Sequence, residues 1–487
     1  MSVKLKLFCR SIPSTAKAGR VTPCAPSQDQ SIRRLQNAAR RGLRALPHPM
    51  LSAFCVTISL LTLAISTFAA DSTLLYNATV HTGTGETFTN SGVLIEGDKI
   101  SLVLNGKTSR RLTVQEMIDL KGQHIYPGLI AADSVLGLTE IDAVRATQDS
   151  AEVGDYTPDV ESWVAVNPDS ELLPVARANG IAYFEPIPSG GAVTGQSALL
   201  AMTGWTYEQM IVKKPAALHV FWPGMDLSTT PKEKSRDKEK WKSLEDQAKE
   251  RRAKLAALAD FFDEAKAYAK AKGAATNGSP APEKIPAWEA MLPYVRGELP
   301  LVIHADEMRQ IKSAVEWATT NKFKAYLAGG RDAWMLAGLL ATNGIPVIYE
   351  NTFTQPARDT ESYDVHFHAP EVLRAAGVQV IFSQGPSDFG ASLARNLPYA
   401  TAQAIAFGLP KEDALKGITL YPAQMMGVAD QLGTLEPGKQ ATLLVCDGDI
   451  FDIRSNVKRM WIAGKEVSLE SRHTKLYEKY KNRPKPQ

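Results

Sequence analysis

Two histidines separated by a single residue, His366 and His368, are the most obvious pair of metal-ligand side chains in this sequence. Imidazole nitrogens bind zinc, copper, iron and nickel, and in an extended segment residues at i and i+2 point to the same side. The pair directly precedes a predicted helix, Ala369–Ala376. This position favours a loop or surface role for the two histidines, with metal binding as the alternative.

The loop Ser189–Ser197 (SGGAVTGQS) is a second candidate site, because it follows a predicted strand. Gly190 and Gly191 permit close approach of the backbone, and N–H groups of such a loop could bind a carboxylate or an oxyanion. Ser189 and Gln196 would add polar side chains to this substrate-binding loop. The loop lacks the lysine of a phosphate-binding loop, which disfavours nucleotide binding. A purely structural turn is the alternative.

Several other kinds of site are excluded by motif and composition. No G-x-S-x-G elbow surrounds any serine, which disfavours a Ser–His–acid hydrolase. Cys9, Cys24 and Cys55 lie in the first 70 residues, so that Cys446 alone remains in the rest of the chain. An intramolecular disulfide and cysteine-based metal sites are therefore excluded there. Basic residues are interspersed with acidic ones, so nucleic acid is not an expected partner.

The beginning of the chain has the composition of a targeting segment. Residues 1–49 contain ten Lys or Arg against Asp29 alone, and residues 50–70 carry no charge. A basic region, an apolar stretch and small residues at its end predict a signal peptide cleaved after Ala69, with Thr67 at position −3. The protein would then be exported, to the periplasm or outside the cell. An uncleaved membrane anchor over residues 50–70 is the alternative.

Export changes the interpretation of the net charge. The whole chain has 55 basic and 52 acidic residues, which gives a net charge of +3. Removal of the ten basic residues and one acidic residue of the leader leaves a net charge of −6 on about 417 residues. The working protein is therefore expected to be mildly acidic and globular, and its charge requires no acidic partner.

Short β runs occur at both ends of this remaining chain. They are Thr73–Val80, Ser91–Glu96, Lys99–Leu104, Ala441–Cys446 and Val457–Ile462. Turn residues separate them, and we expect residues 71–125 and 431–470 to build one small β-sandwich domain. Residues 471–487 form a basic tail that we expect to be frayed.

Residues 126–430 alternate short apolar strands with segments of helical length. The predicted strands are His124–Ala131, Gly180–Pro186, Pro300–His304, Lys322–Leu327, Ile345–Tyr349 and Val378–Ser383, and the predicted helices include Met308–Thr319 and Arg331–Thr342. This alternation predicts parallel βα units, in either a doubly wound sheet or a (β/α)8 barrel. The charge-rich segment 231–285 interrupts it as a helical insertion and linker. Such a helix usually has a solvated face, and a lid over the site is the alternative.

Several local stretches along residues 72–470 form a recognisable series, namely Leu74–Gly106, Ile118–Ile130 (IDLKGQHIYPGLI), Thr419–Gly427 and Gly433–Asp447 (GTLEPGKQATLLVCD). In this order they resemble the amidohydrolase superfamily. Two further stretches, Val166–Gly180 and Pro188–Trp205, are most similar to the imidazolonepropionase-like group. The resemblance implies an α/β fold, namely a (β/α)8 TIM barrel with a small β-sandwich domain. It also implies hydrolysis of C–N bonds other than peptide bonds, in amides or cyclic amides, with one or two divalent metals.

The resemblance identifies site residues, although most of them differ from the family's pattern. The two histidines expected on the first barrel strand are replaced by Asp133 and Val135. His304, at the end of the fifth strand, matches a metal-ligand position of the family. The aspartate expected at the end of the eighth strand is replaced, because its position falls on Gln384 or Gly385. Asp388 follows three or four residues later. His304 is thus implied as a metal ligand, and Asp133 and Asp388 as catalytic bases or auxiliary ligands.

Three functions remain compatible with this degenerate metal site. The first is an exported hydrolase that acts on a small molecule with one divalent metal, zinc or similar, which would activate water. The second is a metal-free pseudoenzyme or small-molecule-binding protein on the same barrel, without a cofactor. The third is metal-independent chemistry by other residues at the barrel mouth. The membrane is a partner only if the leader is uncleaved.

Overall fold

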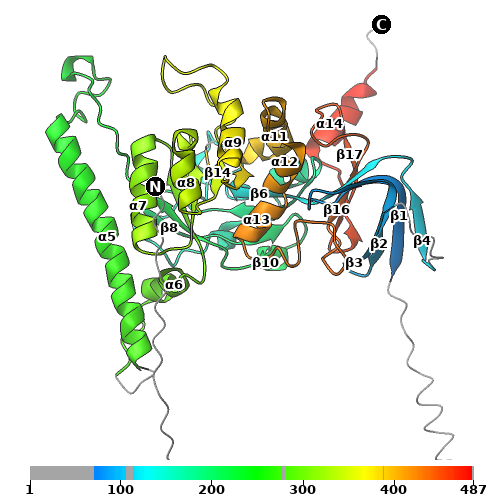
Figure 1. Cartoon of the computed structure of the whole chain (residues 1–487), viewed down its shortest axis with the longest axis horizontal. Coiled ribbons are helices and arrows are strands. Elements are labelled where there is room, and N and C mark those ends of the chain that lie inside the picture. The colour runs from blue at the N-terminus through cyan, green and yellow to red at the C-terminus, as the bar shows by residue number, and fades with distance from the viewer. Residues whose placement is uncertain (1–70, 106–112, 276–279, 388, 485–487) are drawn as a thin grey trace, which may run out of the picture. The chain divides into compact units, whose positions relative to one another are not determined.

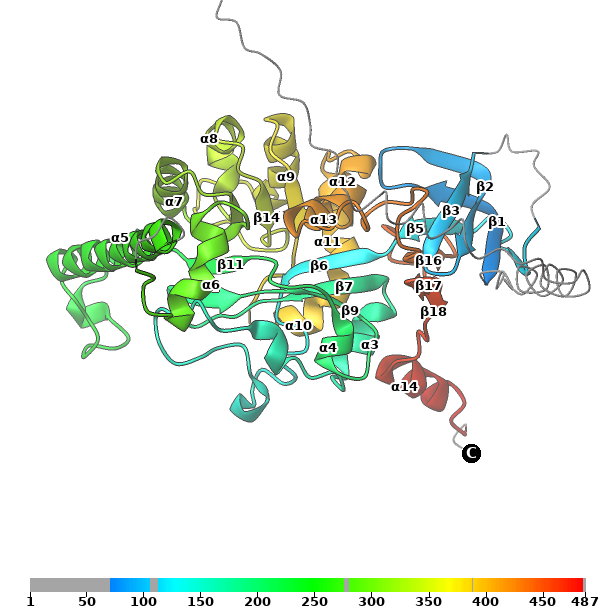
Figure 2. The same ribbon diagram turned by 90° about the horizontal axis from the view of Figure 1, so that it is seen from below.

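The computed structural model describes residues 71–105, 113–275, 280–387 and 389–484 (Figures 1 and 2). The predicted signal peptide or membrane anchor lies outside these residues and stays a prediction, as does the catalytic role of Asp388. Among the described helices, none has both the length and the apolar character that a membrane span requires.

An eight-stranded sheet combines strands from both ends of the described chain. Its strands are β1 (Ser72–His81), β2 (Thr87–Glu96), β3 (Lys99–Leu104), β4 (Glu116–Asp119), β5 (His124–Pro127), β16 (Leu443–Cys446), β17 (Val457–Ile462) and β18 (Lys465–Glu466). They lie in the order β18-β17-β16-β5-β1-β2-β3, and β4 pairs with β1. The antiparallel pair β5–β16, with Pro127 opposite Leu443, joins the two ends. Alternating apolar residues such as Val93, Ile95 and Val445 form a separate core for this sheet.

A pair of neighbouring imidazoles lies in this sheet, that of His81 buried and that of His124 half-buried. His81 Nε2 lies 2.9 Å from Nδ1 of His124, and the His81 ring stacks on Tyr126 with 4.2 Å between centroids. Burial, followed by the charges of Lys411 and His124, lowers the pKa of His81 from 6.5 to about 4, and Asp449 acts in the opposite direction.

We expect the free energy of unfolding to fall as the pH is lowered from about 6.5 towards 4. The unfolded chain binds a proton at His81 in this range while the folded chain does not, so acid favours unfolding by roughly 2 kcal/mol. Urea unfolding at pH 7.0 and 4.5 measures the loss, and His81→Gln should reduce the difference between the two pH values. An equal difference in the variant would assign the acid sensitivity to other groups.

Eight further strands form the wall of the α/β part. They are β6 (Leu129–Ser134), β7 (Ile181–Pro186), β8 (Val193–Gln196), β11 (Leu218–Phe221), β12 (Leu301–Ala305), β13 (Ala325–Gly329), β14 (Val347–Tyr349) and β15 (Val380–Phe382). Backbone hydrogen bonds divide them between a sheet of order β10-β9-β7-β6 and one of order β15-β14-β13-β12-β11-β8; β9 is Leu199–Ala201 and β10 is Ile211–Lys213. Strands β11 to β15 are mutually parallel, as the strand–helix alternation predicts.

Side-chain hydrogen bonds connect the two sheets at both junctions. Ser383, directly after β15, donates to the carbonyl oxygens of Ala132 and Asp133 of β6 at 2.8 and 3.0 Å. Ser197, directly after β8, donates to Glu185 of β7 at 2.7 Å. The two sheets are thus linked at both junctions, and their strands share one large apolar core with the helices that cover them.

Strand β8 departs from an all-parallel wall, because it runs antiparallel to β11. A parallel crossover needs a dozen or more residues, whereas only six residues separate the end of β7 from the start of β8. The short connection therefore excludes the parallel orientation that an ideal (β/α)8 barrel would have at this strand.

Helices follow the parallel strands and cover them. The α-helices are α3 (Leu172–Arg177), α4 (Tyr207–Met210), α5 (Leu244–Ala275), α6 (Pro286–Val295), α7 (Met308–Thr320), α8 (Ala337–Thr342), α9 (Val365–Ala375), α10 (Gly390–Leu393), α11 (Leu397–Ala406), α12 (Lys411–Gly417), α13 (Leu420–Met425) and α14 (Arg472–Lys481). Short 3-10 turns are η1 (Arg145–Thr147), η2 (Ser162–Ala165), η3 (Lys232–Lys234), η4 (Ala333–Leu336) and η5 (Ala394–Asn396). In both views α7, α8, α9 and α12 lie in sequence along one side of the strands. Helix α14 lies within the tail that was expected to be frayed, and Ser471 caps its N-terminus.

The charge-rich insertion contains the long helix α5, which lies beside α7 in both views (Figures 1 and 2). Leu258, Phe262 and Ala265, near its middle, are buried. The Phe262 ring packs against Trp317 of α7, with centroids 4.8 Å apart. These residues follow the i, i+4, i+7 spacing of one helix face, and this apolar face anchors the insertion to the rest of the fold.

Candidate metal centre

Asp133 lies near the end of β6 with its side chain fully buried. Its backbone has φ of +52°, a left-handed conformation that few residues other than glycine adopt. The conformation is held from both sides: the Asp133 N–H donates to Glu185 Oε2 at 3.0 Å, and the carbonyl accepts the Ser383 hydroxyl. Contacts with β7 and with the residue after β15 thus fix the Asp133 backbone, and with it the direction of the carboxylate.

Two imidazoles from adjacent parallel strands face this carboxylate. His219 lies on β11 and His304 on β12, and His219 Nδ1 is 3.0 Å from His304 Nε2. The same nitrogens lie 3.9 and 3.7 Å from Asp133 Oδ1. One ligand atom from each of the three residues lies within 4.8 Å of the other two. Phe221 stacks on the His304 ring, with centroids 4.0 Å apart, and holds its orientation.

This arrangement fits a divalent cation. Both carboxylate oxygens of Asp133 are buried and have no hydrogen-bond partner within the described part of the chain. Such groups are costly unless they are paired or bind a metal. Burial, with the neighbouring His219, holds the pKa of His304 well below its usual value, so its imidazole is neutral, as a ligand must be. Two nitrogens and one oxygen are a usual donor set for catalytic zinc and related ions.

A further carboxyl group, that of Glu350, adjoins the cluster. Glu350 directly follows β14, and its charge acts on Asp133. Burial is the main reason that the pKa of Glu350 is raised to about 7; the neighbouring Asp133 opposes the shift, and the charge of Asp306 adds to it. Burial and the charge of Glu350 likewise raise the pKa of Asp133. A side chain at position 385 would collide with the Glu350 carboxylate. Glycine at this position therefore leaves room for Glu350.

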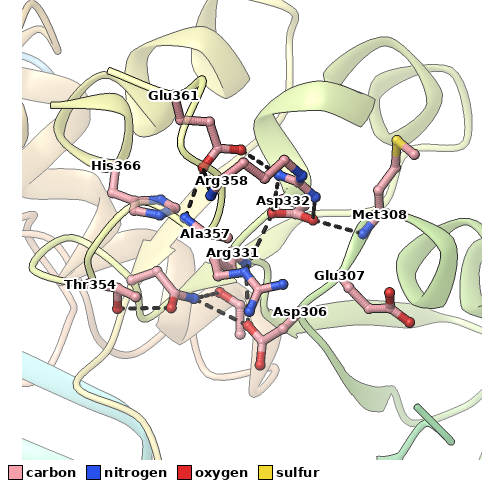
Figure 3. A network of polar contacts seen from close by, with 12 residues as sticks. Asp306, Glu307, Met308, Arg331, Asp332, Thr354, Ala357, Arg358, Glu361 and His366 are labelled. Atoms are coloured by element: carbon pink, nitrogen blue, oxygen red, sulfur yellow. Dashed lines mark hydrogen bonds and ion pairs between the residues drawn. The ribbon is translucent and has the colours of Figure 1, made fainter. Parts of the chain in front are cut away.

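A polar network surrounds the ends of β12 and β13, as Figure 3 shows. Arg358, from the loop after β14, forms ion pairs with the buried Asp332 and with Glu361. Asp332 also accepts the Met308 N–H at 3.1 Å. Burial alone would raise the pKa of Asp332, but the hydrogen bonds from Arg358 and Met308 outweigh it and hold the pKa below its usual value. The network therefore ties the loop after β14 to the end of β13, next to Asp306.

The structure brings together two of the residues singled out in the sequence. His304 and Asp133 lie in one buried cluster, and Val135 is buried with the apolar core. Asp388 is outside the described residues, so its place relative to the cluster is not described. The roles of these residues in metal binding and catalysis stay proposals.

The predicted substrate-binding loop is engaged with the segment that follows β6. Ser189 N–H donates to the Ser150 carbonyl at 2.7 Å, and a side chain at Gly190 or Gly191 would collide with residues 151–155. Gln196 is buried; its amide nitrogen donates to the Pro158 carbonyl, and its oxygen accepts the Tyr294 hydroxyl. These contacts give the loop a structural role, and its role in substrate binding stays a prediction.

His366 and His368 lie inside α9 rather than in an extended segment. Residues two apart on a helix point in different directions. His366 is buried, with Nδ1 3.0 Å from the Tyr349 hydroxyl, whereas His368 is half-exposed and lies 3.4 Å from Asp364. The expected loop or surface position is therefore wrong, because both histidines lie within a helix and His366 is buried. Their imidazoles do not converge on a common ligand position.

No motif in the sequence points to His219, Glu185 or Glu350, which also lie at the cluster. His219 lies in the short apolar run Leu218–Phe221, whose length gives little periodicity to detect. Glu185 and Glu350 lie within and directly after predicted strands that are otherwise apolar. A carboxylate there is rarely buried without a partner, and this signal could have found both residues.

Comparisons with known proteins relate the chain to amidohydrolases. Residues 364–467 match the model of the amidohydrolase family. An amidohydrolase from Thermotoga maritima MSB8 has a similar structure, with 26% identity, a TM-score of 0.69, and coverage of 81% of this chain and 99% of that one. Its similarity implies a TIM barrel with a small domain.

Two curated relatives are also similar to this chain, one at lower sequence identity and the other over a shorter region. The amidohydrolase tasK of Hapsidospora irregularis is 20% identical over 78% of this chain, and an imidazolonepropionase of Brucella suis is 26% identical over 31% of it. The matches span 40% and 36% of those relatives' own lengths. The chain is therefore similar to members of the amidohydrolase superfamily, and over part of its length to imidazolonepropionases.

Proposed function

We propose that the protein is a metal-dependent hydrolase that cleaves a C–N bond other than a peptide bond in a small molecule. One divalent cation would be held by Asp133, His219 and His304. The observation that carries the proposal is the fully buried Asp133 carboxylate, which lacks a hydrogen-bond partner among the described residues and faces two imidazole nitrogens at 3.7 and 3.9 Å. The names of the related amidohydrolases support the reaction class.

The residues around the cluster would have different roles in such a reaction. A bound divalent ion supplies Lewis acidity and lowers the pKa of a water molecule. Glu350 is the carboxyl group available to hold a proton beside the ligands, because burial favours its protonated form. Phe221 covers one face of His304 and keeps water from it. Asp306 adds negative charge at the mouth, where its Oδ1 accepts the Arg331 N–H at 3.2 Å.

We also propose that the eight wall strands form one (β/α)8 barrel and that the mature protein is exported. The hydrogen bonds of Ser383 and Ser197 across the two sheet junctions support the barrel, together with the similarity to the Thermotoga amidohydrolase. Export rests on the basic and apolar composition of residues 1–70.

Metal analysis of the purified protein tests the proposed function directly. We expect about one equivalent of zinc, iron, manganese or cobalt per chain, and chelation should abolish hydrolysis of a responsive substrate from a panel of cyclic amides and N-acyl compounds. Activity should return when the metal is restored. A protein that takes up none of these ions after incubation with each of them would contradict the proposal and favour the metal-free binding protein.

A further inference from the structure

We infer that Glu185 is the residue that positions the metal centre, because it contacts two of the three proposed ligands at once. The inference rests on the proposed function for its metal-binding consequence. Glu185 lies on β7, a strand that contributes none of the three proposed ligands, and its side chain is fully buried.

The Glu185 carboxylate is fixed by two hydrogen bonds. Its Oε2 accepts the N–H of Asp133 at 3.0 Å, and its Oε1 accepts the Ser197 hydroxyl at 2.7 Å. Within the described residues no Lys or Arg forms an ion pair with it; its neighbour is instead the imidazole of His219, whose Nε2 lies 3.7 Å from Oε1. A buried carboxylate held in this way has a defined position and directs its charge at the imidazole.

The bond to Asp133 sets the direction of that ligand. Asp133 has a left-handed backbone, with φ of +52°, which persists only when the surroundings impose it. Its N–H is the donor that Glu185 holds, and its carbonyl is held by Ser383 on the other side. Loss of the Glu185 acceptor would release the N–H and allow the Asp133 carboxylate to turn away from the imidazoles.

The Glu185 carboxylate also sets the tautomer of His219, the second proposed ligand. A neutral imidazole carries its proton on one nitrogen only, and the group near the other nitrogen decides which. The negative charge of Glu185 beside Nε2 favours the proton there. Nδ1, which faces Asp133 and His304, then has its lone pair free for a cation.

Glu185→Gln tests the inference with two readouts, of which the first is metal affinity, with the thermal midpoint as a check on stability. Metal affinity, measured by competition with a chelator, should fall about 10–100-fold, whereas the thermal midpoint of the metal-free variant should not fall, since glutamine removes a buried charge. Ser197→Ala is the matched control: it removes one hydrogen bond but keeps the charge and the Asp133 contact, and should lower affinity clearly less than Glu185→Gln does. Unchanged affinity with a lowered midpoint would assign Glu185 a purely structural role and overturn the inference.

The second readout needs no metal. Nitrogen NMR of the metal-free protein with labelled histidine, assigned by comparison with His219→Gln, should show His219 protonated at Nε2, and Glu185→Gln should shift protons towards Nδ1. An unchanged tautomer in the variant would overturn the inference. If the tautomer shifts but the parent protein binds no metal, the proposed function fails while the positioning of the imidazole by Glu185 stands.

Discussion

Replacing His219 by alanine should remove bound metal and reduce hydrolysis by about a thousandfold or more. The three proposed ligands come from β6, β11 and β12, and loss of one leaves a carboxylate and a single imidazole to hold the ion. Metal catalysis supplies several kcal/mol of transition-state stabilisation, and each ~1.4 kcal/mol lost costs a factor of ten in rate. Metal content by mass spectrometry and turnover of the same substrate measure the two effects.

His366→Ala is the matched control for this experiment. His366 is also a buried histidine, but its Nδ1 lies 3.0 Å from the Tyr349 hydroxyl, and it is not part of the cluster. Its replacement should leave the metal content unchanged. Full metal occupancy in His219→Ala would show that the ion binds elsewhere, and equal losses in both variants would point to a general loss of structure.

The second large effect is expected in stability, when the anchor of the inserted helix is removed. Phe262 of α5 is fully buried, and its ring packs against Trp317 and Phe323 with centroids 4.8 and 5.4 Å apart. Truncation of a buried phenylalanine to alanine costs about 3–5 kcal/mol in lost burial and cavity formation. Phe262→Ala should therefore lower the free energy of unfolding in urea by that amount.

Leu244→Ala, at the other end of the same helix, controls for helix propensity. Leu244 is 50% exposed, and surface substitutions usually change stability by less than about 0.5 kcal/mol. If Phe262→Ala costs no more than Leu244→Ala, the helix is not part of the cooperative fold, and the insertion would instead behave as a separately mobile element.

The sequence supports the fold further than it supports the site. The strand motif ending at His304 and the run leading to Asp133 could be recognised locally, because each is a short apolar strand followed by a polar residue. His219 could not, since its strand has four residues and its significance depends on the contact with His304, 85 residues away. Glu185 depends in the same way on the pairing of β7 with β6. Convergence of strand ends is a property of the tertiary arrangement, which a single sequence does not specify.

The eight-stranded sheet that joins both ends of the chain has a consequence for the order of folding. The hydrogen bond between Tyr126 and Asp449 spans 323 residues, and the pairing of β5 with β16 closes a loop of similar length. Closing such a loop costs more chain entropy than any local contact, and contacts of this separation slow folding. During synthesis β5 must therefore wait, with one edge unpaired, until β16 emerges. A chaperone that recognises exposed strand edges would have its longest opportunity at this stage.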